Sequence, residues 1–343
     1  MIDLLRHVQP QRVFVSLREH IGDVVNSTAA LHCLRQRFPT AHLCVEVGEQ
    51  AAPVLQNFPG IDDLWLRPTH QGVWGKVQFI WRLRKGCFDL AVILDDSADM
   101  VLHAWLGGIP LRVGVSRKPK FRSLYTAFVP HAPSRHETLA HFRDLVALLG
   151  CDLSDYRPRL YPSSEDQQFA LTTLQQAGWD GKAPLVGVHP SASRPHRQWF
   201  PDRFAQVCDA LSVRGAQCVV LGGPGDRQLA EEILRHCRGQ PLVLTGRLTV
   251  LQLAALMPCL RLLITADSGP MHIAAAMGTK VVALYGLSDP AYTGPFGEGH
   301  VIIRYNEPCV GCTAERCLHD RECMKRISVE EVVNAAMRYV AAE

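Results

Sequence analysis

Thr265-Ala266-Asp267-Ser268-Gly269-Pro270-Met271-His272-Ile273-Ala274-Ala275-Ala276 is the stretch of sequence that decides the fold. It follows Leu262-Leu263-Ile264, a short apolar run typical of a buried parallel strand. Proline is favoured in the first turn of a helix, because the amide hydrogen that it lacks would have no partner there. Pro270 therefore predicts a helix that begins just past the C-terminal end of a strand. In open α/β sheets this is where ligands bind.

A helix that begins at this place favours an anion, typically a phosphate, through its free backbone amides and its dipole. The alternative is an ordinary strand-to-helix turn with Ser268 as the N-cap. Asp267 and His272 favour the ligand site, because an ordinary turn needs neither polar group.

The length and composition of the chain describe a soluble globular protein. A chain of 343 residues suggests two domains, and 47% hydrophobic with 20% charged residues is enough to build two cores. The net charge is +3, from 36 Lys and Arg against 33 Asp and Glu. Because this balance is nearly even, it does not predict nucleic-acid binding.

One local basic run stands out at Arg112–Arg122, which holds five basic residues. A solvated loop and a patch for an anionic lipid or phosphate are both open there. The N-terminus lacks a secretory apolar region, and no apolar run approaches the roughly 20 residues that span a bilayer. We therefore expect a cytoplasmic chain.

Strands alternate with helices along the whole chain, which predicts parallel, doubly wound sheets. Strands are expected at 12–17, 42–47, 64–66, 90–94, 111–115, 185–189, 217–221, 242–244, 262–264 and 281–284. Helices are expected from Asp23 to Phe38 and at 49–57, 73–85, 138–150, 164–178, 202–213, 225–237, 249–257, 270–277 and 328–341. Residues 152–162 are the expected linker. Two such domains imply a cleft that both sets of strand C-termini face.

The loop His189-Pro190-Ser191-Ala192-Ser193-Arg194-Pro195-His196-Arg197-Gln198-Trp199 follows the first strand of the second domain. Ser191 and Ser193 offer hydroxyl donors, and Arg194 and Arg197 offer guanidinium groups whose geometry suits phosphate oxygens. An exposed basic loop is the alternative.

Leu221-Gly222-Gly223-Pro224-Gly225-Asp226 follows the next strand. Gly222 and Gly223 allow a ligand to approach the backbone closely, although a glycine-rich turn alone is weak support. Three such loops at the ends of neighbouring strands together suggest a nucleotide-diphosphate site.

Asp23 is the carboxylate of interest in the first half, because the Gly22-Asp23 turn follows the first strand. There it could act as a general base on an incoming hydroxyl, with a helix N-cap as the alternative. His20 is a weaker candidate for acceptor contact. Asp95-Asp96 could bind a metal or acceptor hydroxyls, but a solvated turn is the favoured interpretation.

The sequence resembles glycosyltransferase family 9, the ADP-heptose:lipopolysaccharide heptosyltransferases. The segments that carry the resemblance occur in family order and at family spacing across nearly the whole chain: Gly22-Asp23-Val24, His189 to Ser193 with Arg197 and Trp199, Leu221-Gly222-Gly223, and Asp267 to His272. The resemblance implies a GT-B fold, an inverting mechanism, and ADP-L-glycero-D-manno-heptose as the usual donor. It assigns residues 1–160 to acceptor binding and 161–327 to the nucleotide sugar. Residues 328–343 would form a C-terminal helix that packs back toward the first domain.

The resemblance also implies a role for each matching residue. Asp23 would be the catalytic base, with His20 and Gly22 at the acceptor, and Asp267 would contact the sugar or hold its turn. The donor would be bound by Ser191, Ser193, Arg197, Gly222, Gly223, Asp267, Ser268, Gly269, Pro270, Met271 and His272. No cofactor is required for transfer, because helix amides and basic side chains would stabilise the departing diphosphate.

The implied partners are a nucleotide-diphosphate sugar and a lipid-linked or other glycan acceptor, with peripheral contact to the inner membrane and without nucleic acid. One departure concerns the loop before Trp199, where the family commonly has lysine and this chain has Arg197. Arginine keeps the charge but differs in geometry, so donor and acceptor identity do not follow from this loop.

Twelve cysteines in a cytoplasmic chain need an explanation other than disulfides. Eight are scattered, mostly in apolar surroundings, and read as buried small hydrophobes. The other four, Cys309, Cys312, Cys317 and Cys323, lie within 15 positions and suit a tetrahedral site. Structural zinc or iron and free thiols are both open, because the spacing is tighter than in most zinc ribbons.

Heptosyl transfer to the lipopolysaccharide inner core is thus the leading hypothesis. Glycosyl transfer to a protein or a small molecule is the first alternative. A silent nucleotide-sugar-binding protein is disfavoured, because position 23 keeps a carboxylate. An epimerase of GT-B shape would need acid and base groups on both sugar faces, and the sequence offers no clear set.

Overall fold

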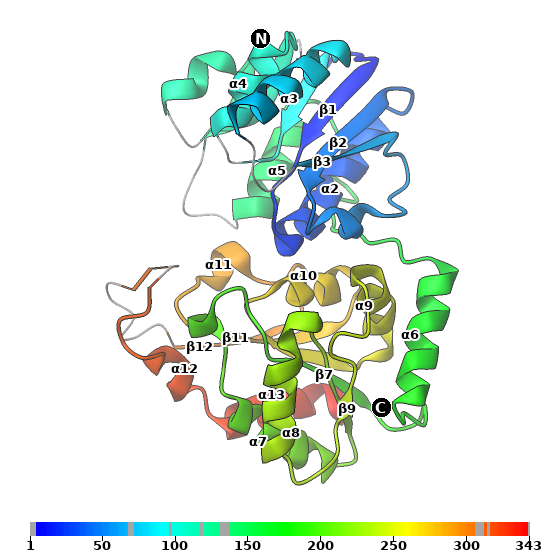
Figure 1. Ribbon diagram of the computed structural model, residues 1–343, viewed down its shortest axis with the longest axis vertical. Helices are drawn as coiled ribbons and strands as arrows, with labels where there is room; N and C mark the ends of the chain where they lie inside the picture. The colour runs from blue at the N-terminus through cyan, green and yellow to red at the C-terminus, as the bar shows by residue number, and fades with distance from the viewer. Residues whose placement is uncertain are drawn as a thin grey trace. The chain divides into compact units, whose positions relative to one another are not determined.

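The computed structural model describes residues 5–67, 72–95, 98–116, 119–130, 137–305, 312–313 and 316–341. It divides into two compact units, Met1–Arg159 and Leu160–Glu343. Each unit is built around its own parallel sheet, as Figure 1 shows by colour from blue to red.

The first unit has a six-stranded sheet in the order β3-β2-β1-β4-β5-β6, and every pairing is parallel. Its strands are β1 (Arg12–Ser16), β2 (His42–Gly48), β3 (Asp63–Arg67), β4 (Leu90–Ile93), β5 (Leu111–Ser116) and β6 (Ala127–Pro130). Its helices are α2 (Ile21–Arg37), α3 (Val73–Lys85), α4 (Ala98–Leu106) and α5 (Glu137–Leu148), with short 3-10 turns η1 (Ala52–Leu55) and η2 (Pro119–Leu124). The strand order reverses between β1 and β4, so the loops after these two strands flank the switch point where such sheets bind ligands.

The second unit has the order β12-β11-β10-β7-β8-β9, again all parallel. Its strands are β7 (Leu185–His189), β8 (Gln217–Val220), β9 (Leu242–Val243), β10 (Leu262–Ala266), β11 (Lys280–Tyr285) and β12 (Val301–Arg304). Its helices are α6 (Ser164–Gln176), α7 (Pro201–Ser212), α8 (Arg227–His236), α9 (Val250–Leu256), α10 (Gly269–Ala276), α11 (Pro290–Thr293), α12 (Glu322–Arg326) and α13 (Val329–Val340), with 3-10 turns η3 (Pro195–Arg197), η4 (Pro224–Asp226) and η5 (Met257–Cys259). Here the order reverses between β7 and β10.

Three sequence-based expectations need correction. The helix expected at 49–57 is only the turn η1, because Pro53 falls in the interior of the expected helix, where it removes a backbone hydrogen bond, and because Asn57 has a φ of 65°. Strands β6 and β12 were not expected, since both are four residues long and lie at sheet edges. Helices α4, α11 and α12 were not expected either.

The last helix, α13, packs within the second unit. It begins with the predicted capping box, in which Ser328 Oγ accepts from the Glu331 amide at 3.2 Å and Glu331 Oε2 accepts from the Ser328 amide at 2.9 Å. Its apolar side, including Val332 and Ala336, is buried in the core of the second unit, against α7 and strands β10, β11 and β12. The expectation that it also packs back toward the first unit stays a prediction.

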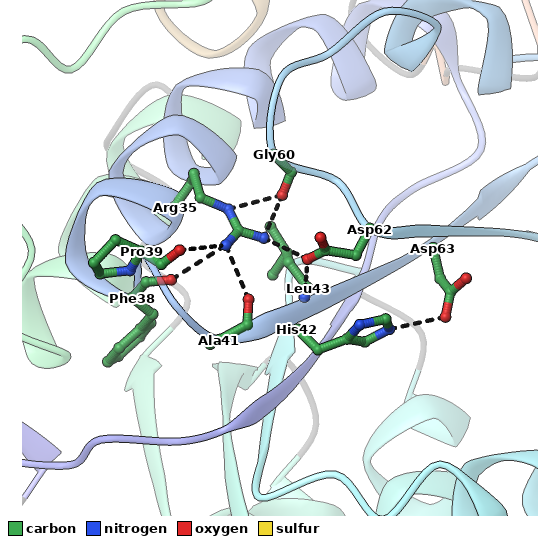
Figure 2. A network of polar contacts seen from close by, with 9 residues as sticks. All are labelled: Arg35, Phe38, Pro39, Ala41, His42, Leu43, Gly60, Asp62 and Asp63. Carbon is green, nitrogen blue, oxygen red and sulfur yellow. Dashed lines mark hydrogen bonds and ion pairs between the residues drawn. The ribbon is translucent and has the colours of Figure 1, made fainter.

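A polar network holds the C-terminal end of α2 and the start of β2 (Figure 2). Arg35 contacts Asp62 Oδ2 at 2.7 Å, and the Leu43 amide donates to the same oxygen at 2.7 Å. Arg35 also donates to backbone carbonyls of Phe38, Pro39, Ala41 and Gly60. Gly60 has a φ of +86°, and a Cβ there would lie 2.7 Å from the Arg35 side chain. The network fixes α2, the helix whose first turn carries Asp23.

Candidate functional site

The loops after β7, β8 and β10 lie side by side at one edge of the second sheet. In the sheet register His189 is the partner of Thr265, and Val188 is the partner of Val220. The expected convergence of the three loops follows from this pairing. The loops after β7 and β10 flank the switch point of this sheet.

Arg197 and Asp267 form an ion pair at this switch point. Arg197 Nη1 lies 3.2 Å from Asp267 Oδ2, with 24% of the Arg197 side chain and 10% of the Asp267 side chain exposed. Within the part of the chain that the structure describes, the buried Arg197 Nε has no hydrogen-bond partner. Leaving a buried charged donor unpaired is costly, so this atom calls for an acceptor from a ligand.

Ser268 occupies the N-cap position of α10, but its hydroxyl makes no capping hydrogen bond. The hydroxyl lies 3.0 Å from Thr265 Oγ1 and 3.3 Å from His189 Nδ1. The first turn of α10 has no acidic residue, and the carboxylate of Asp267, just before the N-cap, is paired with Arg197. This departs from an ordinary capped turn and favours an anion site.

His189 is buried beneath these hydroxyls. Burial lowers the pKa of its imidazole from 6.5 to about 4, so the ring is neutral at pH 7. A neutral imidazole has one nitrogen that accepts and one that donates. His189 can therefore orient the Ser268 hydroxyl without adding charge.

The other expected donor-site residues divide into accessible and buried groups. Ser193 is exposed, and Ser191, Gly222, Gly223, Gly269 and Pro270 are partly exposed. Met271 is fully buried and its sulfur accepts from the Tyr285 hydroxyl at 3.4 Å, so it packs the core beneath the site. His272 is 8% exposed, at the end of the same helical turn.

The glycines of the loop after β8 are also needed for contacts within the chain. A Cβ at Gly222 would lie 2.9 Å from the Asp226 side chain, and the Gly223 amide donates to Asp226 Oδ2 at 2.7 Å. Because Gly222 has no side chain, the Asp226 side chain can lie against the backbone there. The sequence alone predicts only that a ligand could approach the backbone at this place.

Asp23 is the third residue of α2, and His20, which is exposed, is the N-cap residue. The N-cap alternative for Asp23 is therefore wrong. Its carboxylate lies 3.2 Å from Arg18 Nη1 and keeps 22% of its surface exposed. Gly22, partly exposed, precedes it in the first turn. Asp23 comes from the loop and helix after β1, beside the switch point of the first sheet.

Asp95 belongs to a buried cluster and not to a solvated turn. Arg67 Nη1 lies 2.5 Å from Asp95 Oδ2, and Arg67 Nε lies 2.5 Å from Glu46 Oε1. Ser16 donates to Glu46 Oε2 at 2.9 Å. The two carboxylates raise the pKa of the Arg67 guanidinium. Asp96 lies outside the described residues.

Sequence reasoning missed this cluster, which joins the ends of β1, β2, β3 and β4. Its signal was Glu46, a carboxylate inside an apolar run that predicts a buried parallel strand. A buried carboxylate needs a cation, and Arg67 at the end of the neighbouring strand could have been proposed.

Arg112, the first residue of the basic run at Arg112–Arg122, is not part of a free cationic patch. Arg112 donates through Nε to the Leu124 carbonyl at 2.6 Å and through Nη1 to the Pro110 carbonyl at 2.9 Å. Its charge is thus used to hold backbone carbonyls. Arg117 and Lys118 lie outside the described residues.

The predicted metal site gains no support. Cys309 lies outside the described residues, so the full set of four is not tested. Among the residues that are described, no three His, Cys, Asp or Glu side chains are grouped as metal ligands. Cys323 is buried in the core, and a Cβ at Gly286 would lie 2.8 Å from its sulfur. Cys323 therefore acts as a core residue.

Two doubly wound parallel sheets, each with its own switch point, are the architecture of the GT-B fold. The solved structure of a family 9 glycosyltransferase from Veillonella parvula matches with a TM-score of 0.83 and 26% identity, over 96% of this chain and 97% of that one. The Escherichia coli ADP-heptose lipopolysaccharide heptosyltransferase II matches in fold with a TM-score of 0.76 and 22% identity, over 96% and 98%.

The sequence comparison identifies the family within this class. The model of glycosyltransferase family 9 (heptosyltransferase) matches residues 77–322. Lipopolysaccharide heptosyltransferase 3 of Escherichia coli K12 is 28% identical over 292 residues, which are 82% of this chain and 84% of the relative. The chain belongs to glycosyltransferase family 9, and it is a glycosyltransferase.

Proposed function

We propose that the protein transfers a heptose from ADP-L-glycero-D-manno-heptose to a hydroxyl of the lipopolysaccharide inner core, at the cytoplasmic side of the inner membrane. Its family membership supports heptosyl transfer. The names of its relatives support this donor and acceptor class, since one acts as a lipopolysaccharide heptosyltransferase and another is named for ADP-heptose.

The donor diphosphate binds at the β7/β10 switch point in this proposal. The observation that carries it is Arg197, whose Nε is buried without a partner among the described residues while Nη1 faces Asp267. A diphosphate oxygen would accept from this guanidinium and from the Ser268 hydroxyl, near the open end of α10. Ser191 and Ser193 supply further hydroxyl donors from the β7 loop.

Asp23 is the base in this proposal. It removes the proton from the acceptor hydroxyl, and the resulting oxygen attacks the anomeric carbon from the face opposite the diphosphate. The bond between the anomeric carbon and the diphosphate oxygen breaks, and ADP leaves with the electron pair. The configuration inverts in one step, without a covalent intermediate. Arg18, 3.2 Å from the carboxylate, holds Asp23 in position.

Arg197, Ser268 and the dipole of α10 stabilise the charge that develops on the departing diphosphate. Such donors act without reorganisation because the fold has already aimed them. Asp267 then has two roles in turn, because it holds Arg197 before the donor binds and faces the sugar side afterwards.

The test is incubation of the enzyme with a panel of ADP- and UDP-sugars and candidate acceptors, with products read by mass. We expect product only with ADP-heptose and a lipopolysaccharide core acceptor, and nuclear magnetic resonance should show inverted anomeric configuration. Transfer from a UDP-sugar would overturn the donor assignment. Retained configuration would remove Asp23 as a simple base.

A second acceptor class, a protein or small-molecule hydroxyl, is open because the Arg197 loop departs from the common family pattern. The same panel decides it. Heptose transfer to a protein acceptor, with no transfer to the lipopolysaccharide core, would replace the inner-core proposal while leaving the donor assignment in place.

A further inference from the structure

Helix α3 has apolar side chains on two opposite sides. On one side Leu83 is fully buried, and Phe79 packs against Phe14 in the core of the first unit. On the other side four apolar side chains face solvent, which we call the α3 apolar stripe: Val73, Trp74, Val77 and Trp81, exposed by 78%, 81%, 49% and 58%.

The spacing explains why these four side chains form one surface. Val73, Val77 and Trp81 recur every four residues, and Trp74 lies three residues before Val77, so all lie along one side of the helix. Contiguous exposed apolar surface of this kind marks an interaction site, and tryptophan is enriched where proteins meet the membrane interface.

The charges on α3 identify the kind of partner. The helix carries Lys76, Arg82, Arg84 and Lys85 and contains neither Asp nor Glu. Lys76 is paired with Asp99 at 3.1 Å. The Lys85 ammonium lies 3.7 Å from the centre of the Trp81 ring, so positive charge borders the stripe directly. Arg84 is exposed beside it.

We propose that the α3 apolar stripe docks the protein on a bilayer surface rich in anionic lipid. An amphipathic helix with aromatic residues on one face and lysine and arginine beside them lies in the interface, with its rings at the boundary of headgroups and acyl chains. Arg84 and Lys85 pair with anionic headgroups. On the neighbouring helix α4, Trp105 and Leu106 are also exposed, by 50% and 44%. This inference does not depend on which sugar is transferred.

In the part of the chain that is described, no helix is both long and apolar enough to cross a bilayer. Docking by α3 is thus a surface contact that does not require such a helix. It would bring the first unit, where Asp23 lies, to the surface from which a glycolipid acceptor is presented.

The test is co-sedimentation of the full chain with vesicles of phosphatidylglycerol and phosphatidylethanolamine, or of phosphatidylcholine alone. We expect binding to the anionic vesicles only. Replacing both tryptophans (W74Q/W81Q) should weaken that binding at least tenfold, and R84Q/K85Q should weaken it about 25-fold, since each basic residue near an anionic surface is worth about fivefold. Brominated lipid should quench tryptophan fluorescence in the parent, and much less in W74Q/W81Q, which keeps Trp105 of helix α4 but lacks the two tryptophans of the stripe.

The matched control is F169Q/V213Q, which removes two exposed apolar side chains from the second unit. It should bind vesicles like the parent. All variants are first compared by circular dichroism and melting temperature, and since the altered side chains are exposed we expect no change. Two outcomes overturn the proposal: anionic-vesicle binding that W74Q/W81Q leaves intact, or, without lipid, self-association that the same variant abolishes.

Discussion

Arg197 has two anionic groups competing for one guanidinium, the Asp267 carboxylate and, in the proposed function, a diphosphate. Replacing it by lysine keeps the charge but removes the fork that could serve both. We expect Arg197→Lys to weaken ADP binding at least about tenfold, measured by calorimetry. A hydrogen bond to a charged group contributes about 1.5–3 kcal/mol, and the lower value corresponds to about tenfold in affinity. Arg214→Lys, at an exposed site after α7, should bind normally. Normal affinity in Arg197→Lys would place the diphosphate elsewhere.

Asp23 has a simpler test. Asp23→Asn keeps the size of the side chain and removes the base, so kcat should fall by about two to four orders of magnitude with ADP affinity unchanged. Asp202→Asn is the matched control, since Asp202 also lies in the first turn of a helix, α7. A turnover number within threefold of the parent for Asp23→Asn would exclude Asp23 as the base.

His189 predicts a dependence of stability on pH. Its pKa is lowered to about 4 in the folded chain from 6.5, so as pH falls from 6.5 toward 4 the unfolded chain binds the proton and the folded chain does not. The free energy of unfolding therefore falls over this window, by about 3 kcal/mol from this group alone. Denaturant unfolding at pH 7 and pH 4.5 should show a smaller loss in His189→Gln than in the parent. His236→Gln, at an exposed site, should lose as much as the parent does.

The loops of the candidate site could be predicted from the sequence, but the contacts between their residues could not. Arg197 and Asp267 could be named because both follow strands, whereas their ion pair spans 70 positions and needs the sheet register. Met271 reads as part of the motif, yet it is buried, because the helix turns its side chain inward. Glu46 carried a signal, as a carboxylate in an apolar run, but its partner Arg67 lies 21 positions away and is brought to it by the pairing of β2 with β3.

Helices with capping boxes and long apolar periodicity could be predicted from the sequence. Ser328 with Glu331 marks the start of α13, and Ser163 with Asp166 marks that of α6, because such signals are local. The four-residue strands β6 and β12 could not be predicted, since a short edge strand depends on pairing with a neighbour. The packing partner of α13 also depended on the tertiary fold.

The capping box of α13 offers a test at the scale of the element. Ser328→Ala removes the acceptor for the Glu331 amide, and we expect the free energy of unfolding to fall by about 1 kcal/mol. Ser212→Ala, at the exposed C-terminal end of α7, should change it by less than about 0.5 kcal/mol. An equal effect of both substitutions in denaturant unfolding would show that the cap contributes nothing specific.

For the whole molecule, each unit has its own sheet, and the proposed donor site belongs to the second. Ligand that binds only the folded state stabilises it by about 2.7 kcal/mol at 100 times Kd. With ADP at that concentration, hydrogen exchange should slow in the loops after β7, β8 and β10 and leave the strands of the first unit unchanged. Protection confined to the first unit would contradict the assignment of the donor to Leu160–Glu343.

Arg67 lies on β3, the outermost strand of the first sheet, yet it neutralises Glu46 on β2 and Asp95 after β4. The edge strand of an open sheet can detach from its one neighbour, and it is also where another molecule can add a strand in aggregation. Here, detaching β3 would remove the Arg67 guanidinium from two carboxylates, and breaking a buried pair of this kind costs about 3–5 kcal/mol. The cluster therefore resists fraying of this edge, and it links the outermost strand to the cooperative unfolding of the strands beside it.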